Sequence, residues 1–393
     1  MHQIVKLLPG RHKRAKAGHP WIFSNEIAER DTAMEIDAGT AVTVVGDNGE
    51  TYGTALFNPY SLVAGRLVDR KTDVAVDGAF FADRLGRALA LRNRLFGEPF
   101  YRLVHAEADG LPGLVIDRYG DAAVLQLNAA GMDVRRDMII DALDALVPLN
   151  TIVLRNDSPS RLREELSLEV SAARGAADAA VPVRENGATF AASLAQGQKT
   201  GWFFDQRENR AFIASLARDA GVIDFYAYGG GFGVQALVAG AAEAVLVDRS
   251  AAALESAAES AVRNGVAARC QLVKADAFEE MERRAADDMR YGIVIADPPA
   301  FVKSKKDLHR GSRAYRKMVR LAARLVAPGG ILFVASCSHN VAPGLFGDLV
   351  QKGLSDAHRS GRILRAAGAA PDHPVHPGLP ETAYLKSLTL QLD

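Results

Sequence analysis

Val222-Ile-Asp-Phe-Tyr226, followed by Ala227-Tyr-Gly-Gly-Gly-Phe-Gly233, is the stretch that decides the fold of this chain. It indicates a short buried strand, a glycine-rich turn and the start of a helix near Val234. That order of elements opens a doubly wound sheet, in which the first strand-to-helix turn faces the ligand. Glycines in such a turn let a ligand approach the backbone closely.

The glycine turn alone leaves two adenosyl ligands open. Gly231, Gly233 and Ala236 satisfy the G-x-G-x-x-A spacing of dinucleotide sites. S-adenosylmethionine would use the same kind of turn, so the turn does not separate it from NAD. Alternatively, the glycines could serve only to shape a tight turn and bind no ligand. Four glycines within five positions disfavour this purely structural role.

Strands and helices alternate downstream of the turn. Further strands are expected at residues 244–247, 271–275, 293–296 and 331–336, with helical stretches between most of them. This alternation predicts an α/β fold, a Rossmann-like doubly wound sheet of mostly parallel strands. Ligands bind such sheets beyond the carboxyl ends of the strands, so the residues at those ends carry the information about function.

Acidic residues stand at the ends of three of these strands. Asp248 is placed to accept hydrogen bonds from ribose hydroxyls. Asp276 suits an adenine amino group, with a helix N-cap as the alternative role. Asp297 ends the strand at 293–296. Three carboxylates at successive strand ends fit an adenosyl ligand better together than any one of them does alone.

The loop Asp297-Pro-Pro-Ala-Phe301 is stiff, because each proline fixes φ and the first proline also restricts Asp297. A rigid carboxylate beside an aromatic ring can hold a planar base, which a dehydrogenase does not need. The densest basic stretch of the chain follows directly: Lys303, Lys305, Lys306, Arg310, Arg313, Arg316, Lys317 and Arg320. Phosphate contacts are one interpretation, and a solvated helix face is the other.

The chain has two cysteines, too few for a disulfide framework and without the spacing of a zinc site. Cys270 begins a strand, as a buried packing residue would. Cys337 follows the strand at 331–336 and is therefore carried to the same edge of the sheet as Asp297. A thiolate there is nucleophilic enough to add to a pyrimidine ring.

The N-terminal half is predicted to hold two smaller domains. Residues 1–72 contain short apolar stretches divided by Gly, Pro and Asn, which is typical of a small β-rich domain. Residues 73–186 combine a helix at 78–96 with several strands in an α+β domain, and residues 171–180 are expected to be a connector. The third domain then covers residues 187–393.

The first twenty residues are basic and lead into two aromatic residues. Five cations and no acid precede Pro20, and Trp21 and Phe23 follow. Basic side chains beside aromatic rings suit RNA phosphates and bases. A solvated basic terminus beside a buried tryptophan is the alternative.

The composition sets limits on these interpretations. The 393 residues are 48% hydrophobic and 24% charged, as in ordinary globular proteins, and the formal net charge is zero. A surface that binds a polyanion must therefore be local. Since the sequence shows no signal-peptide pattern and no apolar run of about 18 residues, a cytoplasmic protein without membrane contact is expected.

The chain resembles a known protein family along nearly its whole length, and five longer sequence motifs carry the resemblance. They are His19-Pro-Trp-Ile-Phe23, Ala106-Glu-Ala-Asp-Gly-Leu-Pro-Gly-Leu-Val-Ile-Asp-Arg-Tyr119, Gly197-Gln-Lys-Thr-Gly-Trp-Phe-Phe-Asp-Gln-Arg207, Asp297-Pro-Pro-Ala-Phe301 and Ser336-Cys-Ser338. In them the chain resembles class I rRNA methyltransferases with an N-terminal PUA domain, specifically the RlmI-like group that makes 5-methylcytosine in 23S rRNA. The resemblance implies a seven-stranded methyltransferase sheet, a PUA-like first domain, S-adenosylmethionine as cofactor and rRNA as partner.

The resemblance and the strand ends together define the expected site, in which no metal is included. The catalytic residues are Cys337, as covalent nucleophile, and Asp297. The cofactor-binding residues are Lys199, Asp205, Arg207, Asp224, Tyr226, Gly229, Gly230, Gly231, Asp248, Arg249, Asp276, Ala277 and Asp297. The substrate-binding residues are Pro298, Pro299, Phe301, Lys303, Lys305, Lys306, Arg310, Arg11, Lys13, Arg14 and Trp21.

The chain departs from the family pattern at two positions. Gly229 stands where threonine is expected, and Ala227 stands where cysteine or serine is common. Both changes bear on cofactor affinity rather than on cofactor identity. The oligomeric state, a homodimer included, is left open by the sequence.

Three other functions stay open at this stage. An RNA methyltransferase that acts on the amino group of guanine or adenine would use the Asp297 loop in the same way and without a cysteine. A catalytically weak RNA-binding or assembly factor would retain only a vestigial cofactor pocket. A NAD dehydrogenase ranks last, because no histidine with an acid partner is evident as a hydride site.

Overall fold

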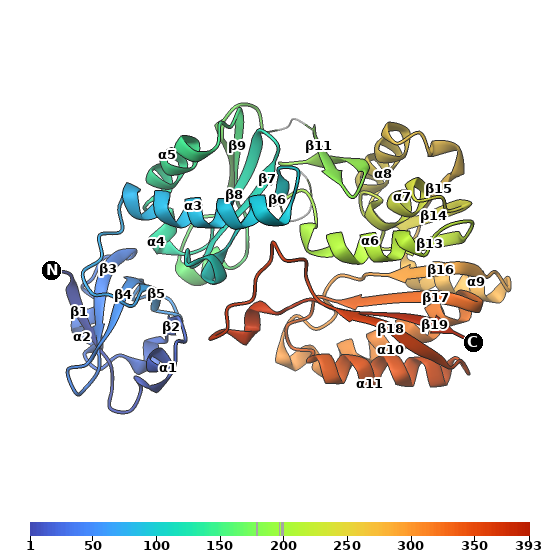
Figure 1. The fold of residues 1–393 in the computed structure, drawn as a ribbon. Coiled ribbons are helices and arrows are strands. Elements are labelled where there is room, and N and C mark those ends of the chain that lie inside the picture. The colour runs from blue at the N-terminus through green and yellow to red at the C-terminus, as the bar shows by residue number, and fades with distance from the viewer. Residues whose placement is uncertain (178–179, 196, 198–199) are drawn as a thin grey trace. The chain divides into compact units, whose positions relative to one another are not determined.

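The structure, a computed structural model, describes residues 1–177, 180–195, 197 and 200–393 (Figure 1). The chain divides into two compact units. The first unit consists of Met1–Val181, Ser193–Trp202 and Pro371–Thr382, and the second of Pro182–Ala192, Phe203–Ala370 and Ala383–Asp393. This division into two units does not test the three domain ranges expected from the sequence, which stay a prediction.

The first unit begins with a five-stranded sheet in the order β1-β3-β4-β5-β2, which confirms the β-rich start. Its elements are β1 (Gln3–Lys6), α1 (Lys13–Lys16), β2 (Trp21–Ile22), α2 (Arg30–Ala33), β3 (Thr40–Val45), β4 (Thr51–Phe57) and β5 (Gly65–Asp69). Gly53 in β4 has φ 123°, and a Cβ there would lie 2.0 Å from the carbonyl oxygen of Asp69. Only glycine fits this close approach of two strands.

A second five-stranded sheet follows, in the order β10-β9-β8-β7-β6. Its elements are α3 (Gly78–Leu95), β6 (Phe100–His105), β7 (Leu114–Tyr119), β8 (Ala122–Leu127), α4 (Ala130–Asp133), α5 (Arg136–Leu146), β9 (Thr151–Asn156) and β10 (Glu169–Arg174). Helix α3 begins where Asp77 accepts a hydrogen bond from the Phe80 amide. The expected α+β unit is present.

The expectation of a connector at residues 171–180 was wrong for its first part. Residues Glu169–Arg174 form β10, which pairs antiparallel with β9 at the edge of the sheet. The strand is mostly exposed, so it lacks the apolar alternation that marks a half-buried strand. Its alanine-rich composition hid an edge strand whose stability comes from the pairing with β9.

The second unit contains a seven-stranded sheet in the order β15-β14-β13-β16-β17-β19-β18. The strands of this unit are β11 (Ala180–Glu185) and β12 (Ala188–Ser193), which form a separate pair, and β13 (Gly221–Phe225), β14 (Glu243–Asp248), β15 (Cys270–Lys274), β16 (Tyr291–Ala296), β17 (Val326–Ser336), β18 (Gly361–Ala367) and β19 (Lys386–Leu392). Strands β13 to β17 are parallel, whereas β19 is antiparallel to both of its neighbours. The predicted doubly wound sheet is confirmed.

Helices cover the seven-stranded sheet. They are α6 (Arg207–Ser215), α7 (Gly231–Val238), α8 (Ala251–Arg263), α9 (Ala277–Ala286), α10 (Leu308–Leu325) and α11 (Pro343–Asp356). Helices α10 and α11 lie side by side along the sheet (Figure 1). Helix α7 begins at Gly231, three residues before the expected start.

The core of the second unit lies between the sheet and its helices. The central strands β13 and β16 are buried along nearly their whole length, with Ile223, Phe225, Val294 and Ala296 at 0% exposure. Parallel strands buried on both faces are near-continuous apolar runs, which is why the sequence predicted them well. No helix among the described residues is long and apolar enough to cross a membrane.

Candidate cofactor and catalytic site

The turn after β13 contains three residues in the left-handed region. Tyr226 has φ 63°, Tyr228 has φ 48° and Gly230 has φ 82°. Left-handed backbone is costly for bulky residues and persists where the surrounding structure enforces it, often at functional sites. The turn is therefore a strained, well-defined loop at the carboxyl end of the central strand.

Two glycines of the turn are required by packing. A Cβ on Gly233 would lie 2.5 Å from the side chain of Leu246, and one on Gly230 would lie 2.9 Å from Val234 and 3.0 Å from Leu246. These contacts hold α7 against β14. For Gly230 and Gly233 the geometry supports the structural role that was the alternative, while Gly229 and Gly231 lie in the same turn as expected.

Asp224 lies under the turn and is buried at 1% exposure. Its Oδ2 accepts a hydrogen bond of 3.0 Å from the Gly233 amide in the first turn of α7. Burial raises the pKa of Asp224 to about 8, and the charges of Asp297 and Asp248 act in the same direction. The side chain thus holds α7 to β13 and lies within electrostatic reach of the other strand-end acids.

Two of the strand-end acids accept hydrogen bonds from the backbone. Asp248 accepts from the Tyr228 amide at 3.0 Å and from the Ser250 amide at 2.9 Å. Asp276 caps α9, with Oδ1 accepting from the amides of Phe278 and Glu279. A carboxylate offers about four acceptor positions, so both residues retain capacity for a ligand hydroxyl or amine. Beside them, Arg249 is exposed and Ala277 is buried.

The hydroxyl of Tyr226 supplies an independent observation about the ligand. It is buried and finds no hydrogen-bond partner among the described residues. Burial raises the pKa of this hydroxyl, and the charge of Asp276 adds to the effect. An unsatisfied buried polar group costs about 1–3 kcal/mol. A polar ligand such as an adenosyl compound fits a turn that leaves a buried hydroxyl in need of a partner.

The Asp297 loop is held by a residue that the sequence did not single out. Gln206 donates from Nε2 to Oδ2 of Asp297 at 2.8 Å, and Asn209 donates to Gln206 at 2.6 Å. Gln206 lies within the string ending at Arg207, so its position next to two expected site residues was the available signal. Within the loop Pro298 is buried, and Pro299 is exposed.

Phe301 packs its ring on two other aromatic side chains. Its ring centroid lies 5.9 Å from that of Phe278 and 4.8 Å from that of Tyr315. Phe301 as a whole is half-buried. The aromatic residue expected beside Asp297 is therefore fixed in place by α9 and α10.

Cys337 lies between two buried serines at the end of β17. Ser336 donates to the Tyr315 hydroxyl at 2.8 Å, and the Ser338 hydroxyl lies 2.9 Å from the same oxygen. Ser338 also accepts a hydrogen bond from the Val302 amide at 3.1 Å, which ties this segment to the Asp297 loop. Both serines are fully buried, whereas Cys337 is half-buried. The thiol is thus presented on a rigid segment.

Lys386 also holds this segment, and the sequence analysis missed it together with Tyr315. The lysine is buried, and its Nζ donates to the carbonyl oxygens of Ser338 at 2.6 Å and of Tyr384 at 2.9 Å. Lys386 starts an apolar strand, where a lysine normally indicates a solvent-facing position, so nothing in the sequence marked its burial. Tyr315 carried no signal either, because it stands inside the basic helical stretch.

The second cysteine has a different environment. Burial raises the pKa of Cys270 to about 11, so its thiol stays protonated near neutral pH. This agrees with a packing residue rather than with a nucleophile.

The cofactor-binding role of Lys199, Asp205 and Arg207 stays a prediction, and the structure shows contacts of the latter two. Lys199 lies outside the described residues. Asp205 accepts a hydrogen bond from the Tyr384 hydroxyl. Arg207 lies 3.4 Å from the carboxylate of Glu185, which also forms a bidentate pair with Arg210. Arg207 therefore takes part in a buried ion-pair network within the second unit.

Some residues of the basic stretch after Phe301 form ion pairs, and others do not. Lys303, Lys305 and Lys306 are exposed, and no ion pair involves them among the described residues. Arg310 pairs with Asp307 at 2.9 Å. Farther along α10, Arg316 pairs with Asp356 and Lys317 with Glu282. Arg313 and Arg320 are exposed as well, and no ion pair among the described residues involves them, so unpaired positive charge lies both directly after the Asp297 loop and along α10.

The expected RNA-binding residues of the first unit also fall into two groups. Arg11 and Lys13 are exposed. Arg14 pairs with Glu26 at 2.8 Å and lies over the ring of Phe23. Trp21 donates from its indole nitrogen to Glu107 at 2.7 Å. Trp21 and Arg14 are thus held by internal contacts, while Arg11 and Lys13 face solvent.

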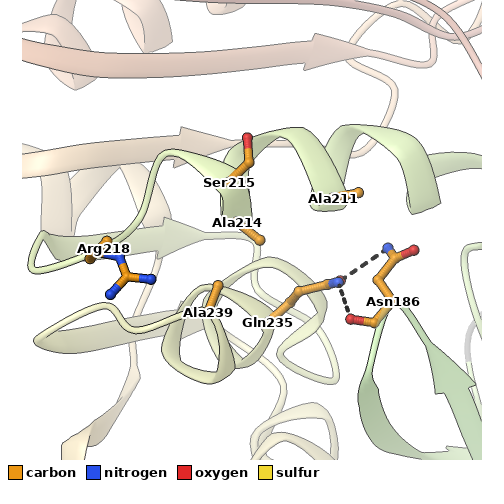
Figure 2. Close-up of a pocket in the computed structure, with 7 residues that line it drawn as sticks. All are labelled: Asn186, Ala211, Ala214, Ser215, Arg218, Gln235 and Ala239. Carbon is orange, nitrogen blue, oxygen red and sulfur yellow. Dashed lines mark hydrogen bonds between the residues drawn. The ribbon is translucent and has the colours of Figure 1, made fainter.

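A separate pocket of about 370 Å³ lies beside α6 and α7 (Figure 2). Asn186 and Gln235 are hydrogen-bonded to each other at its edge, and Arg218 and Ser215 also line it. None of the expected site residues lines this pocket. The candidate site is therefore defined by the strand-end residues rather than by this hollow.

Comparison with known proteins agrees with this geometry. Residues 5–70 match the model of a PUA-like domain, and residues 162–389 match that of an S-adenosylmethionine-dependent methyltransferase. Similar structures include a protein described as a methyltransferase and solved with SAH, which has a TM-score of 0.84 at 22% identity and covers 99% of this chain and 100% of its own. At that identity the likeness shows the fold alone.

Curated relatives match over the whole chain. The ribosomal RNA large subunit methyltransferase I of Pseudoalteromonas atlantica is 37% identical over 99% of both chains. The protein of the same name from Alteromonas mediterranea is 35% identical over 100% of this chain and 99% of its own. The chain therefore belongs to the S-adenosylmethionine-dependent methyltransferases and, among them, to the ribosomal RNA large subunit methyltransferase I family.

Proposed function

We propose that this protein methylates carbon 5 of a cytosine in large-subunit ribosomal RNA and that Cys337 forms a transient covalent bond to the base. The names of the curated relatives supply the class of RNA. The observation that carries the cytosine proposal is the half-buried Cys337, fixed between two buried serines at the strand edge that also presents Asp297. Amino-group methylation has no use for such a thiol.

The chemistry explains why a cysteine is needed. Carbon 5 of cytosine is a weak nucleophile, and S-adenosylmethionine supplies an electrophilic methyl group. When the Cys337 thiolate adds to carbon 6, the new sulfur–carbon bond pushes electron density toward carbon 5. Asp297, within reach of N3 or the exocyclic amine, stabilises the resulting enamine. Once carbon 5 carries the methyl group, loss of its proton expels the thiolate and restores the ring.

The proton acceptor belongs to the residues near the thiol. Asp297 is a candidate because it lies on the neighbouring strand end, and His339 is another because it is exposed two residues after Cys337. Water is the third. A general base must come within hydrogen-bond reach of the proton that it removes.

The RNA must present an unpaired or flipped base, because the ring faces of a stacked base are covered. Lys303, Lys305 and Lys306 are placed to contact phosphates beside the target base, and Arg11 and Lys13 to contact RNA from the PUA-like domain. The proposal keeps three domains, at residues 1–72, 73–186 and 187–393. With ribosomal RNA as the substrate, the place of action is the cytoplasm.

The covalent step can be tested with RNA that contains 5-fluorocytosine. Fluorine cannot leave as a cation, so the enzyme stays attached to the base after methyl transfer. Wild-type protein with S-adenosylmethionine should give an adduct in denaturing electrophoresis, and Cys337→Ala should give none. Cys270→Ala is the matched control and should retain the adduct. An adduct formed by Cys337→Ala would remove Cys337 from this role.

Methylation of a guanine or adenine amino group is the second candidate. The Asp297-Pro-Pro-Ala-Phe301 loop favours it, because Gln206 fixes the carboxylate and two aromatic rings fix Phe301. Such a loop can hold an exocyclic amine without help from a thiol. Full methyl transfer by Cys337→Ala would favour this candidate over the first.

A further inference from the structure

We propose that Lys386 is a positioning residue for Cys337: its ammonium group anchors the segment that carries the thiol and stabilises the thiolate form of that side chain. The inference deepens the proposed function and rests on the nucleophilic role of Cys337. It begins from the pairing of the last strand with β17, which brings the two residues together from positions far apart in the sequence.

The sheet places Lys386 opposite the start of the cysteine segment. Strands β17 and β19 pair antiparallel, with Ser336 opposite Lys386. The lysine side chain then reaches past this pair, because its Nζ donates to the carbonyl oxygen of Ser338 at 2.6 Å. A second hydrogen bond of 2.9 Å goes to the carbonyl oxygen of Tyr384. The ammonium group therefore ties the residue after Cys337 to the chain that leads into β19.

The charge of Lys386 is not compensated by a carboxylate. Its side chain is buried at 8% exposure, and no acidic side chain among the described residues forms an ion pair with it. An ammonium group has three N–H donors, of which the two carbonyls take two. Buried charges are normally paired, so an anion is expected in its neighbourhood.

Cys337 directly precedes Ser338, whose carbonyl oxygen accepts a hydrogen bond from Lys386, so its thiolate is the anion that this inference assigns. Burial lowers the pKa of Lys386 to about 8, whereas its electrostatic interaction with Cys337 opposes that effect. The electrostatic interaction is mutual, so the positive charge of Lys386 should favour the thiolate over the thiol. A nearby cation is a common way to lower the pKa of a reactive cysteine.

Three other described titratable groups around this segment do not provide the cation. Tyr315 of α10 contacts both serines, and burial raises the pKa of its hydroxyl, so it stays neutral near pH 7. Tyr384 donates its hydroxyl to Asp205, which brings a negative charge rather than a positive one. His339 is exposed, with its ring 5.6 Å from that of Tyr384. Lys386 is thus a buried cation beside the thiol in the part of the chain that the structure describes.

The test measures the ionisation of Cys337 directly, in full-length protein. In a Cys270→Ala background, the rate of alkylation by iodoacetamide is followed against pH by intact-protein mass spectrometry. Lys386→Met should move the midpoint upward by at least about one pH unit, which slows alkylation near pH 7 about tenfold. Lys386→Arg, which keeps a cation, should stay close to wild type. Lys352→Met removes an exposed charge on α11 and should leave the midpoint unchanged.

Two results would overturn the inference. One is an unchanged midpoint in a folded Lys386→Met variant, since a merely structural lysine would not shift the ionisation of the thiol. The other needs no variant at Lys386 and so stands even if the methionine variant fails to fold: a midpoint at or above that of an ordinary cysteine thiol, about 8.5, in the Cys270→Ala parent. Alkylation uses neither RNA nor cofactor. A wild-type protein that forms no 5-fluorocytosine adduct would therefore count against the proposed function, while the alkylation profile would still decide this inference.

Discussion

Asp224 couples protonation to folding at the scale of a single residue. Its pKa is raised from 3.8 to about 8 in the folded chain, mainly by burial. Between these two values the folded state holds a proton that the unfolded state releases, so this group makes the protein less stable as pH rises toward 8. The contribution of the protonated Asp224 to the free energy of unfolding is fully present below about pH 4 and is lost as the pH rises through about 8.

Asp224→Asn should remove this dependence. The amide keeps an oxygen that can accept from Gly233 but has no proton to lose. Each pKa unit corresponds to about 1.4 kcal/mol, so the variant should gain a few kcal/mol on wild type between pH 5 and pH 8. Urea unfolding at the two pH values measures the difference. Parallel changes in the two proteins would show that Asp224 titrates normally.

The Tyr226 hydroxyl gives the second prediction at this scale. Tyr226→Phe removes a buried hydroxyl that finds no partner among the described residues, so the ligand-free protein should become more stable by about 1 kcal/mol. The same change should weaken S-adenosylmethionine binding several-fold, because the cofactor loses a hydrogen bond. Thermal unfolding and calorimetric titration test the two halves. Lower stability together with unchanged affinity would contradict the assignment.

Individual residues were predictable from the sequence only where strand ends placed them. Asp297 and Cys337 follow apolar strands, so their edge of the sheet could be inferred. The cofactor role of Arg207 stays a prediction. Its pairing with Glu185 was not predictable, because nothing in their separation along the chain marks that pair. Lys386 was missed for a related reason. A lysine in a strand normally indicates a solvent-facing position, and its burial depends on carbonyl groups that only the folded sheet supplies.

At the scale of elements, the contact between α7 and β14 constrains the glycine turn. Gly233→Ala should lower the free energy of unfolding by about 1–3 kcal/mol, because the added methyl overlaps Leu246. Gly347→Ala is the matched control: Gly347 also lies in a helix, and its Cβ would meet nothing within 4 Å. The control should be stabilised by about 0.5–1 kcal/mol. Equal effects at the two positions, measured by urea unfolding, would mean that packing does not fix this turn.

The burial of the strands explains why the seven-stranded sheet was predicted and strand β10 was not. Strands β13, β14 and β16 are buried apolar runs, which a sequence displays directly. Strand β10 is an exposed edge strand that depends on β9 for its pairing, and this partner is not visible in its own composition. Helix α7 starts earlier than expected because Gly231 and Gly233, which suggested a loop, take helical backbone there.

At the scale of the whole molecule, a chain of zero net charge needs a local surface to bind RNA. We propose the exposed lysines at 303, 305 and 306 as that surface in the second unit. Replacing all three with alanine should weaken RNA binding and lower the slope of log affinity against log salt by about 2, since each single-stranded phosphate contact contributes roughly 0.7. Fluorescence anisotropy at several salt concentrations measures this slope.

A matched control lies on α10, which follows these lysines. Arg316 and Lys317 pair with Asp356 and Glu282, so a double alanine variant should change the salt slope much less than the triple variant. An equal loss in both variants would indicate a general charge effect and would contradict a local phosphate site at Lys303, Lys305 and Lys306.

The most direct test of the proposed activity identifies the methylated nucleoside. Purified protein is incubated with S-adenosylmethionine and unmodified large-subunit RNA, and the digested nucleosides are analysed by mass spectrometry. Wild type should produce 5-methylcytidine, and Cys337→Ala should produce none while still binding the cofactor. Methyl groups found on guanine or adenine amino groups, or 5-methylcytidine made by Cys337→Ala, would contradict the account.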